Sequence, residues 1–65
     1  MHLPNSPADA VRKFMPRNLW MKPREVWDFI GMYSLITMRH TLRQMVLAGE
    51  IERRGEPERY EYRMR

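Results

Sequence analysis

The sequence of 65 residues contains no cysteine. Disulfide bonds and thiolate metal sites are therefore excluded, and stability has to come from packing in one small core. The chain has no run of about 18 apolar residues that could span a bilayer. Its opening MHLPNSP lacks the basic start and apolar centre of a signal peptide. These absences predict a cytoplasmic protein.

Groups that carry out catalysis are also scarce. The chain has two histidines and no glycine-rich loop that could hold a phosphate group. No set of its residues has the spacing of a metal site or a nucleophile triad. We therefore expect no enzymatic activity, no metal and no cofactor.

Acidic residues are missing from the middle of the chain. The formal net charge is +4, with 12 basic and eight acidic residues. Residues 32–49 hold two arginines and no acid, whereas residues 50–65 hold five residues of each sign. A positive balance favours anionic partners. The acid-free segment is the part best suited to approach one.

Two short helices are expected first. In NSPADAVRKFMP, Ser6 can cap the helix, Pro7 suits its first position and Pro16 stops it. The segment PREVWDFIG begins with proline and ends with glycine, as a second helix would. The apolar residues expected to face the core from these two helices are Ala8, Val11, Phe14, Met15, Val26, Phe29 and Ile30.

The third and longest helix is expected over residues 35–48. Gly31 allows a tight turn before it, Ser34 can cap it, and Gly49 suits its exit. Apolar residues recur along it at helical spacing. The expected core stripe is Leu35, Met38, Leu42, Met45 and Val46.

After the third helix the apolar period changes from 3.6 to 2. EIERR and RYEYRM therefore read as two strands, and the four residues GEPE between them as a hairpin loop. The apolar members of the strands are expected to face the helices. The earlier segment NLWMK is either one short strand or an extended link.

This order of elements resembles a winged helix-turn-helix domain. The matching segments are PREVWDFIG, SLITMRHTLRQMVLAGEIERR and GEPERYEYRM, and the most specific piece is TMRHTLRQMVLAGEIERR. The resemblance implies a single α+β domain, mainly α, over residues 1–65. In such domains the third helix reads DNA and the hairpin forms the wing.

A helix in the major groove lies among phosphates, which repel carboxylates. Its arginines can pair with guanine, glutamine can pair with adenine, and methyl groups can touch thymine. The wing arginines are expected to contact the DNA backbone. The candidate DNA-binding residues are Ser34, Ile36, Thr37, Arg39, His40, Arg43, Gln44, Arg53, Arg54 and Arg59.

The sequence therefore predicts a sequence-specific binder of double-stranded DNA. The expected role is a small transcriptional regulator of phage, prophage or plasmid type that occupies an operator as a homodimer. An architectural or recombination role would use the same fold. The alternative is a winged-helix module that binds a protein instead of DNA. The electrically neutral wing, Trp27, and the exposed Ile36 and Leu47 favour this alternative.

Overall fold

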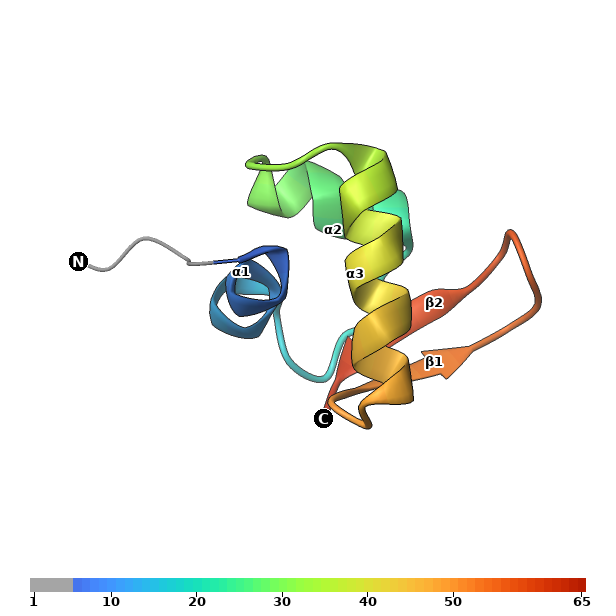
Figure 1. The fold of residues 1–65 in the computed structure, drawn as a ribbon. Coiled ribbons are helices and arrows are strands. Elements are labelled where there is room, and N and C mark those ends of the chain that lie inside the picture. Colours follow the sequence, from blue (N-terminus) through green and yellow to red (C-terminus); the bar gives the residue numbers. More distant parts are fainter. Residues whose placement is uncertain (1–5) are drawn as a thin grey trace.

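The computed structural model describes residues 6–65, which form three helices followed by an antiparallel hairpin (Figure 1). The architecture is α+β and mainly helical. Within this described part, no helix is long and apolar enough to cross a membrane. The elements are α1 (Pro7–Phe14), α2 (Pro23–Ile30), α3 (Leu35–Leu47), β1 (Ile51–Arg54) and β2 (Glu61–Met64).

The limits of α1 follow from its sequence. The Ser6 hydroxyl accepts a hydrogen bond of 3.2 Å from the backbone N–H of Asp9. Pro7 occupies the first turn, where its missing N–H leaves no partner unsatisfied. The helix ends at Phe14, two residues before Pro16, whose ring cannot continue a helix. The predicted first helix is confirmed.

A tight turn joins α2 to α3. Gly31 closes α2 in the left-handed conformation, with φ of 69°. Three residues later, the Ser34 hydroxyl accepts a hydrogen bond of 3.1 Å from the backbone N–H of Thr37 and caps α3. Both predicted helices are confirmed, although α3 ends at Leu47, one residue earlier than expected.

The hairpin has a longer loop than the sequence suggested. β1 and β2 are antiparallel, and Arg54 opposite Glu61 is the last pair before the loop. The six residues 55–60 connect the strands, in place of the four predicted. Gly55 has φ of 97°, and a Cβ there would lie 2.9 Å from the carbonyl oxygen of Arg59. Glycine is therefore required where the chain leaves β1.

The segment between α1 and α2 lies beside β2. The backbone N–H of Met21 donates to the carbonyl oxygen of Tyr62 at 2.8 Å, and the N–H of Tyr62 donates back at 2.7 Å. Arg17 forms a second isolated bridge, with Met64. NLWMK is thus an extended link that pairs with the hairpin at single residues. These bonds fix the hairpin against the helices.

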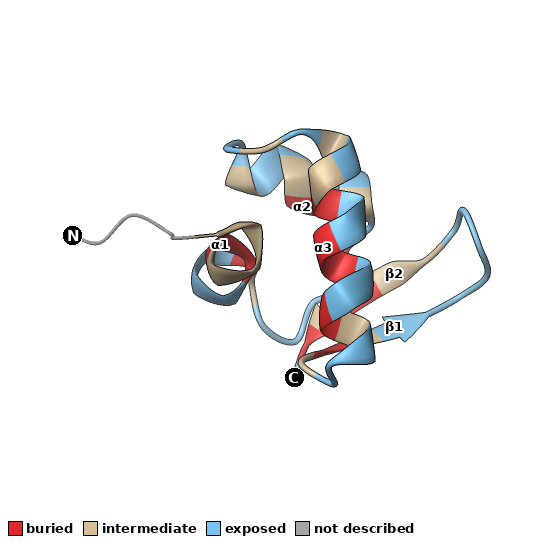
Figure 2. Cartoon of the chain, viewed as in Figure 1, coloured by how far each residue is buried: buried red, intermediate tan, exposed pale blue. Residues whose placement is uncertain are grey.

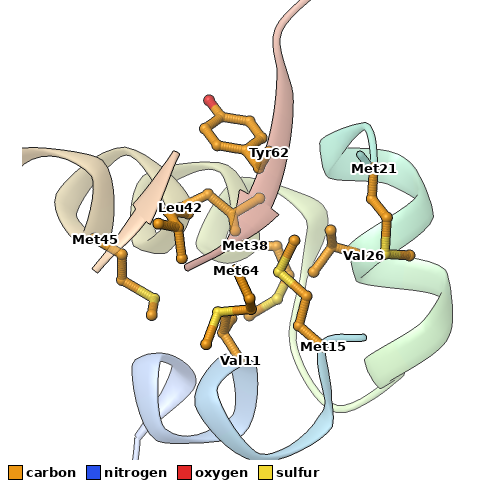
Figure 3. Packing of buried hydrophobic residues seen from close by; sticks show 10 residues of the cluster. Val11, Met15, Met21, Val26, Met38, Leu42, Met45, Tyr62 and Met64 are labelled. Atoms are coloured by element: carbon orange, nitrogen blue, oxygen red, sulfur yellow. The ribbon is translucent and has the colours of Figure 1, made fainter. Parts of the chain in front are cut away.

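One hydrophobic cluster lies between the three helices and the inner face of the hairpin (Figure 3). Half of its ten members are methionines, whose flexible thioether side chains fill irregular spaces. Figure 2 shows buried and exposed positions alternating along α3. The cluster is Val11, Met15, Met21, Val26, Met38, Leu42, Met45, Ile51, Tyr62 and Met64.

Two phenylalanines expected in the core lie at the surface. Phe14 is 43% exposed at the last position of α1, and Phe29 is 59% exposed on α2. On α2, Trp27 packs with Ile30 against the cluster, where Phe29 was expected to pack. The core face of α2 is therefore rotated toward Trp27. The prediction for these two phenylalanines was wrong.

On α3, the core stripe is narrower than predicted and includes one polar residue. Leu35 and Val46 are half-buried, whereas Thr41 is buried. The Thr41 hydroxyl donates a hydrogen bond of 2.8 Å to the carbonyl oxygen of Thr37. Because this bond satisfies the hydroxyl within the helix, the side chain can lie in the core.

An ion pair connects α1 to the start of the hairpin. The Arg12 guanidinium donates from Nε to Oε1 of Glu50 at 2.7 Å and from Nη2 to Oε2 at 2.9 Å. These hydrogen bonds hold the pKa of the Glu50 carboxyl below its ordinary value and raise the pKa of Arg12. This two-pronged pair is the geometry in which an arginine stabilises a carboxylate best.

The pair predicts a dependence of stability on pH. Because the Glu50 pKa is lowered in the folded chain, its contribution is present above the unfolded value of about 4.3 and lost as pH falls through the lowered pKa. Glu50→Gln should therefore lower the melting temperature near neutral pH, and the difference from wild type should shrink in acid. Thermal unfolding followed by circular dichroism at several pH values measures it. A difference independent of pH would contradict this role.

Candidate nucleic-acid interface

The exposed face of α3 lies opposite its buried stripe. At 100° per residue, Ile36, His40, Arg43 and Leu47 fall within one narrow strip along the helix. All four are exposed, Ile36 at 81% and Leu47 at 73%. The cap at Ser34 fixes where this strip begins. α3 therefore presents a continuous strip of side chains to its surroundings.

Arg39 and Arg43 are the cations of this face. Both are exposed, and α3 contains no acidic residue. Among the contacts of residues 6–65, neither guanidinium has a hydrogen bond or ion pair to a protein group. Their positive charges and ten N–H donors are therefore available to an outside partner.

A groove of about 790 Å³ separates this arginine side of α3 from the hairpin. Arg53 of β1 lies on its other wall, with its guanidinium 4.2 Å from the centre of the Tyr60 ring. One acidic residue, Glu58, is part of the lining. The groove is lined by Pro23, Arg39, Arg43, Leu47, Arg53, Glu58, Tyr60 and Tyr62.

The other predicted residues of α3 face a different hollow. Thr37, His40 and Gln44 line a depression of about 520 Å³ between α3 and the start of α1. The two sides of the helix therefore differ in chemistry. The hairpin side of α3 carries arginines, and the α1 side carries hydroxyl, imidazole and amide groups. Ile36 is on the strip between the two sides and is part of neither lining.

Ser34 has a structural role at the start of this surface. Its hydroxyl oxygen accepts the capping bond from the Thr37 N–H, and the hydroxyl donates to Oγ1 of Thr37 at 2.9 Å. Both predicted residues are thus already engaged with each other. Ser34 is exposed beside the first turn of α3.

The three predicted wing arginines do not act as one set. Arg53 faces the groove, and Arg59 is exposed in the hairpin loop. Arg54 lies on the opposite face of the hairpin, where its Nε is 2.9 Å from Oε1 of Glu61. Its guanidinium also lies 4.3 Å from the centre of the Trp20 ring. Because side chains alternate between the two faces of a strand, Arg53 and Arg54 point to opposite faces. Contacts with Glu61 and Trp20 hold the Arg54 guanidinium on the outer face.

Paired charges cover this outer face of the hairpin. Glu52 is opposite Arg63 in the strand register, and the two side chains are 2.7 Å apart. The hydrogen bond from Arg63 holds the pKa of the Glu52 carboxyl below its ordinary value. The Arg63 guanidinium also lies 4.7 Å from the centre of the Trp20 ring. The neutral charge balance seen in the sequence is therefore concentrated on the face away from the groove.

Five residues of the groove were not among the predicted site residues. They are Pro23, Leu47, Glu58, Tyr60 and Tyr62, of which Tyr62 is buried. Leu47 was recognisable as an exposed apolar residue on α3. The others come from α2 and the hairpin, and their place beside α3 depends on how those elements pack.

Comparison with protein-family models, curated proteins and solved structures gives no match to this chain. Over residues 6–65, no three potential metal-binding side chains of histidine, aspartate or glutamate gather in one place.

Proposed function

We propose that the chain is a winged helix-turn-helix protein that binds double-stranded DNA in a sequence-specific manner. The observation that carries this proposal is the acid-free exposed face of α3, with Arg39 and Arg43 unpaired and Arg53 across the groove. Phosphates attract such a face, and unengaged arginines can also pair with guanine edges.

The arrangement of the elements supports the same function. α3 has 13 residues and is about 20 Å long, and the major groove of B-DNA is wide enough to admit a helix. The hairpin projects beside α3 (Figure 1). A duplex that receives α3 in its major groove would have a phosphate strand close to the hairpin.

This geometry gives the residues different roles. Arg39 and Arg43 contact bases or nearby phosphates, and Gln44 on the other side of α3 contacts a base edge. Arg53 and Arg59 contact phosphates, which position the protein without reading sequence. Arg54 keeps the hairpin in place through Glu61 and Trp20. As a regulator of phage, prophage or plasmid type, the protein would act by occupying an operator.

Binding to a random duplex at increasing salt tests the proposal. Because phosphate contacts release counterions, the slope of log K against log salt is expected to lie between about −2 and −4 for Arg39, Arg43, Arg53 and Arg59. Fluorescence anisotropy of a labelled duplex measures it. Binding that is absent at low salt would contradict the proposal.

Two hairpin variants sharpen this experiment. Arg53→Ala should weaken binding to all duplexes about equally and reduce the salt slope by about one unit. Arg54→Ala is the matched control, because its guanidinium already pairs with Glu61 on the opposite face. It should change the slope less, provided that circular dichroism shows an intact fold. Equal changes in the salt slope for both variants would contradict the proposal that Arg53, and not Arg54, contacts a phosphate.

A second candidate function is binding to a protein. Phe29 and Met32 are 59% and 46% exposed near the turn between α2 and α3, and exposed apolar residues often mark protein contacts. In that case the chain would lack salt-dependent affinity for duplex DNA. Phe29→Ala would then weaken binding to the partner, whereas it should leave duplex binding unchanged under the first proposal.

A further inference from the structure

The most exposed large apolar side chains of the described chain lie on the exposed strip of α3. Ile36 is 81% exposed and Leu47 is 73% exposed, more than any other large apolar residue described. Neither belongs to the core cluster or packs against it. These two branched apolar side chains lie on the face that also carries Arg39 and Arg43. They do not contribute to the packing of the core.

The position of the two residues limits what they can contact. They are 11 residues apart on one strip of α3, so they are separated by about 16 Å along the helix axis. Between them lie His40 and Arg43. A partner must therefore offer apolar groups near both ends of the strip and polar, anionic or acceptor groups between them.

We propose that Ile36 and Leu47 recognise the 5-methyl groups of two thymines in the major groove. This inference rests on the proposed function, because it requires α3 to lie in that groove. In the major groove, the thymine methyl is the apolar group that base pairs present. Guanine presents the acceptors N7 and O6 in the same groove, where Arg43 can donate to them. A spacing of about 16 Å corresponds to about five base pairs along the duplex.

The surroundings of each residue support this assignment. Leu47 lines the groove with Arg43 and Arg53, so a duplex held by these arginines brings its bases beside Leu47. Ile36 follows the Ser34 cap in the first turn of α3. No carboxylate lies on α3 to oppose the approach of DNA at either end. The predicted site is one that carries thymine at both ends of the segment read by α3.

Thymine-to-deoxyuridine substitution tests the inference directly. A duplex selected by the wild-type chain from a random pool is resynthesised with single thymines replaced by deoxyuridine, which lacks the methyl group and keeps every hydrogen-bonding group. Affinity is expected to fall about fourfold at each of two positions no more than about five base pairs apart, the value for one buried methyl group.

Variants connect each methyl group to its side chain. In Ile36→Ala one deoxyuridine effect should disappear, and in Leu47→Ala the other should disappear. Both side chains are exposed and alanine favours helix, so α3 is expected to remain intact. Leu19→Ala is the matched control, because Leu19 is 51% exposed between α1 and α2 and lines neither the groove nor the depression beside α3. It should keep both effects.

The outcomes separate this inference from the proposed function. Duplex binding that weakens with salt but is unchanged by every deoxyuridine substitution would overturn the inference and leave DNA binding intact. Deoxyuridine effects that persist in both alanine variants would also overturn it. If the chain binds no duplex and Leu47→Ala instead changes its oligomeric state in sedimentation experiments, the strip is a protein contact and both proposals fail.

Discussion

Replacing Arg39 and Arg43 together with alanine is expected to weaken binding to a selected duplex by about 2–6 kcal/mol, since each arginine that reads a base contributes about 1–3 kcal/mol. The two guanidiniums have no partner within the described fold and both line the groove beside the hairpin. The two substitutions are therefore expected to remove the proposed contacts to DNA without removing contacts of the fold. Anisotropy titrations at constant salt measure the loss.

The stability of the same variant is expected to remain unchanged or to rise. Arg39 and Arg43 are four residues apart on α3, and like charges at this spacing destabilise a helix by about 0.2–0.5 kcal/mol. Alanine also has the highest helix propensity. A thermal melt followed by circular dichroism gives this sign. Weaker duplex binding together with unchanged or higher stability would show that Arg39 and Arg43 have a functional and not a structural role.

A lysine variant separates base reading from charge. Arg39→Lys with Arg43→Lys keeps both positive charges but loses the planar fork that pairs with guanine. It should retain the salt dependence of the wild type and lose most of its preference for the selected duplex over a random one. If the folded double alanine variant of Arg39 and Arg43 binds the duplex as well as wild type, α3 does not lie in the major groove of the DNA.

The second large effect is expected in the core. Leu42 is fully buried on α3, between Met38 and Met45, and contributes to the cluster that joins the helices to the hairpin (Figure 3). Leu42→Ala should cost about 2–5 kcal/mol, because it removes buried methyl groups and leaves a cavity. At about 4–8 °C per kcal/mol, the melting temperature should fall by about 10 °C or more.

Leu47→Ala is the matched control for this core variant. It is the same substitution on the same helix, at a residue that is 73% exposed. Its effect on stability should lie within about 0.5 kcal/mol. Similar melting temperatures for the two variants would mean that α3 is rotated about its axis relative to the structure described.

The helix limits could be predicted from sequence because they depend on local chemistry. Ser6 and Ser34 cap α1 and α3, and Gly31 closes α2, as expected from their positions. The core face of α2 could not be predicted in the same way. In an eight-residue helix, Phe29 and Trp27 both flank Val26, and tertiary packing decides which of them turns inward.

The candidate site was predictable on α3 and less so on the hairpin. The absence of acids in residues 32–49 is visible in the sequence, and the exposure of Arg39 and Arg43 follows from helical spacing. Strand alternation places Arg53 and Arg54 on opposite faces, but the sequence could not show which partners each face offers. The partners of Arg54 depend on the strand register, which places Glu61 opposite it, and on Trp20, which lies 34 residues earlier in the chain.

The methionine-rich core makes the chain sensitive to oxidants. With no cysteine in the sequence, methionine thioethers are the sulfur groups that can be oxidised, and five of them lie in the cluster. Conversion to a sulfoxide places a polar, chiral group among apolar neighbours. Met21 and Met64, each 7% exposed, are the most exposed methionines of the cluster. Among the cluster methionines, Met21 and Met64 are therefore expected to be oxidised first, at the contact between the link and the hairpin.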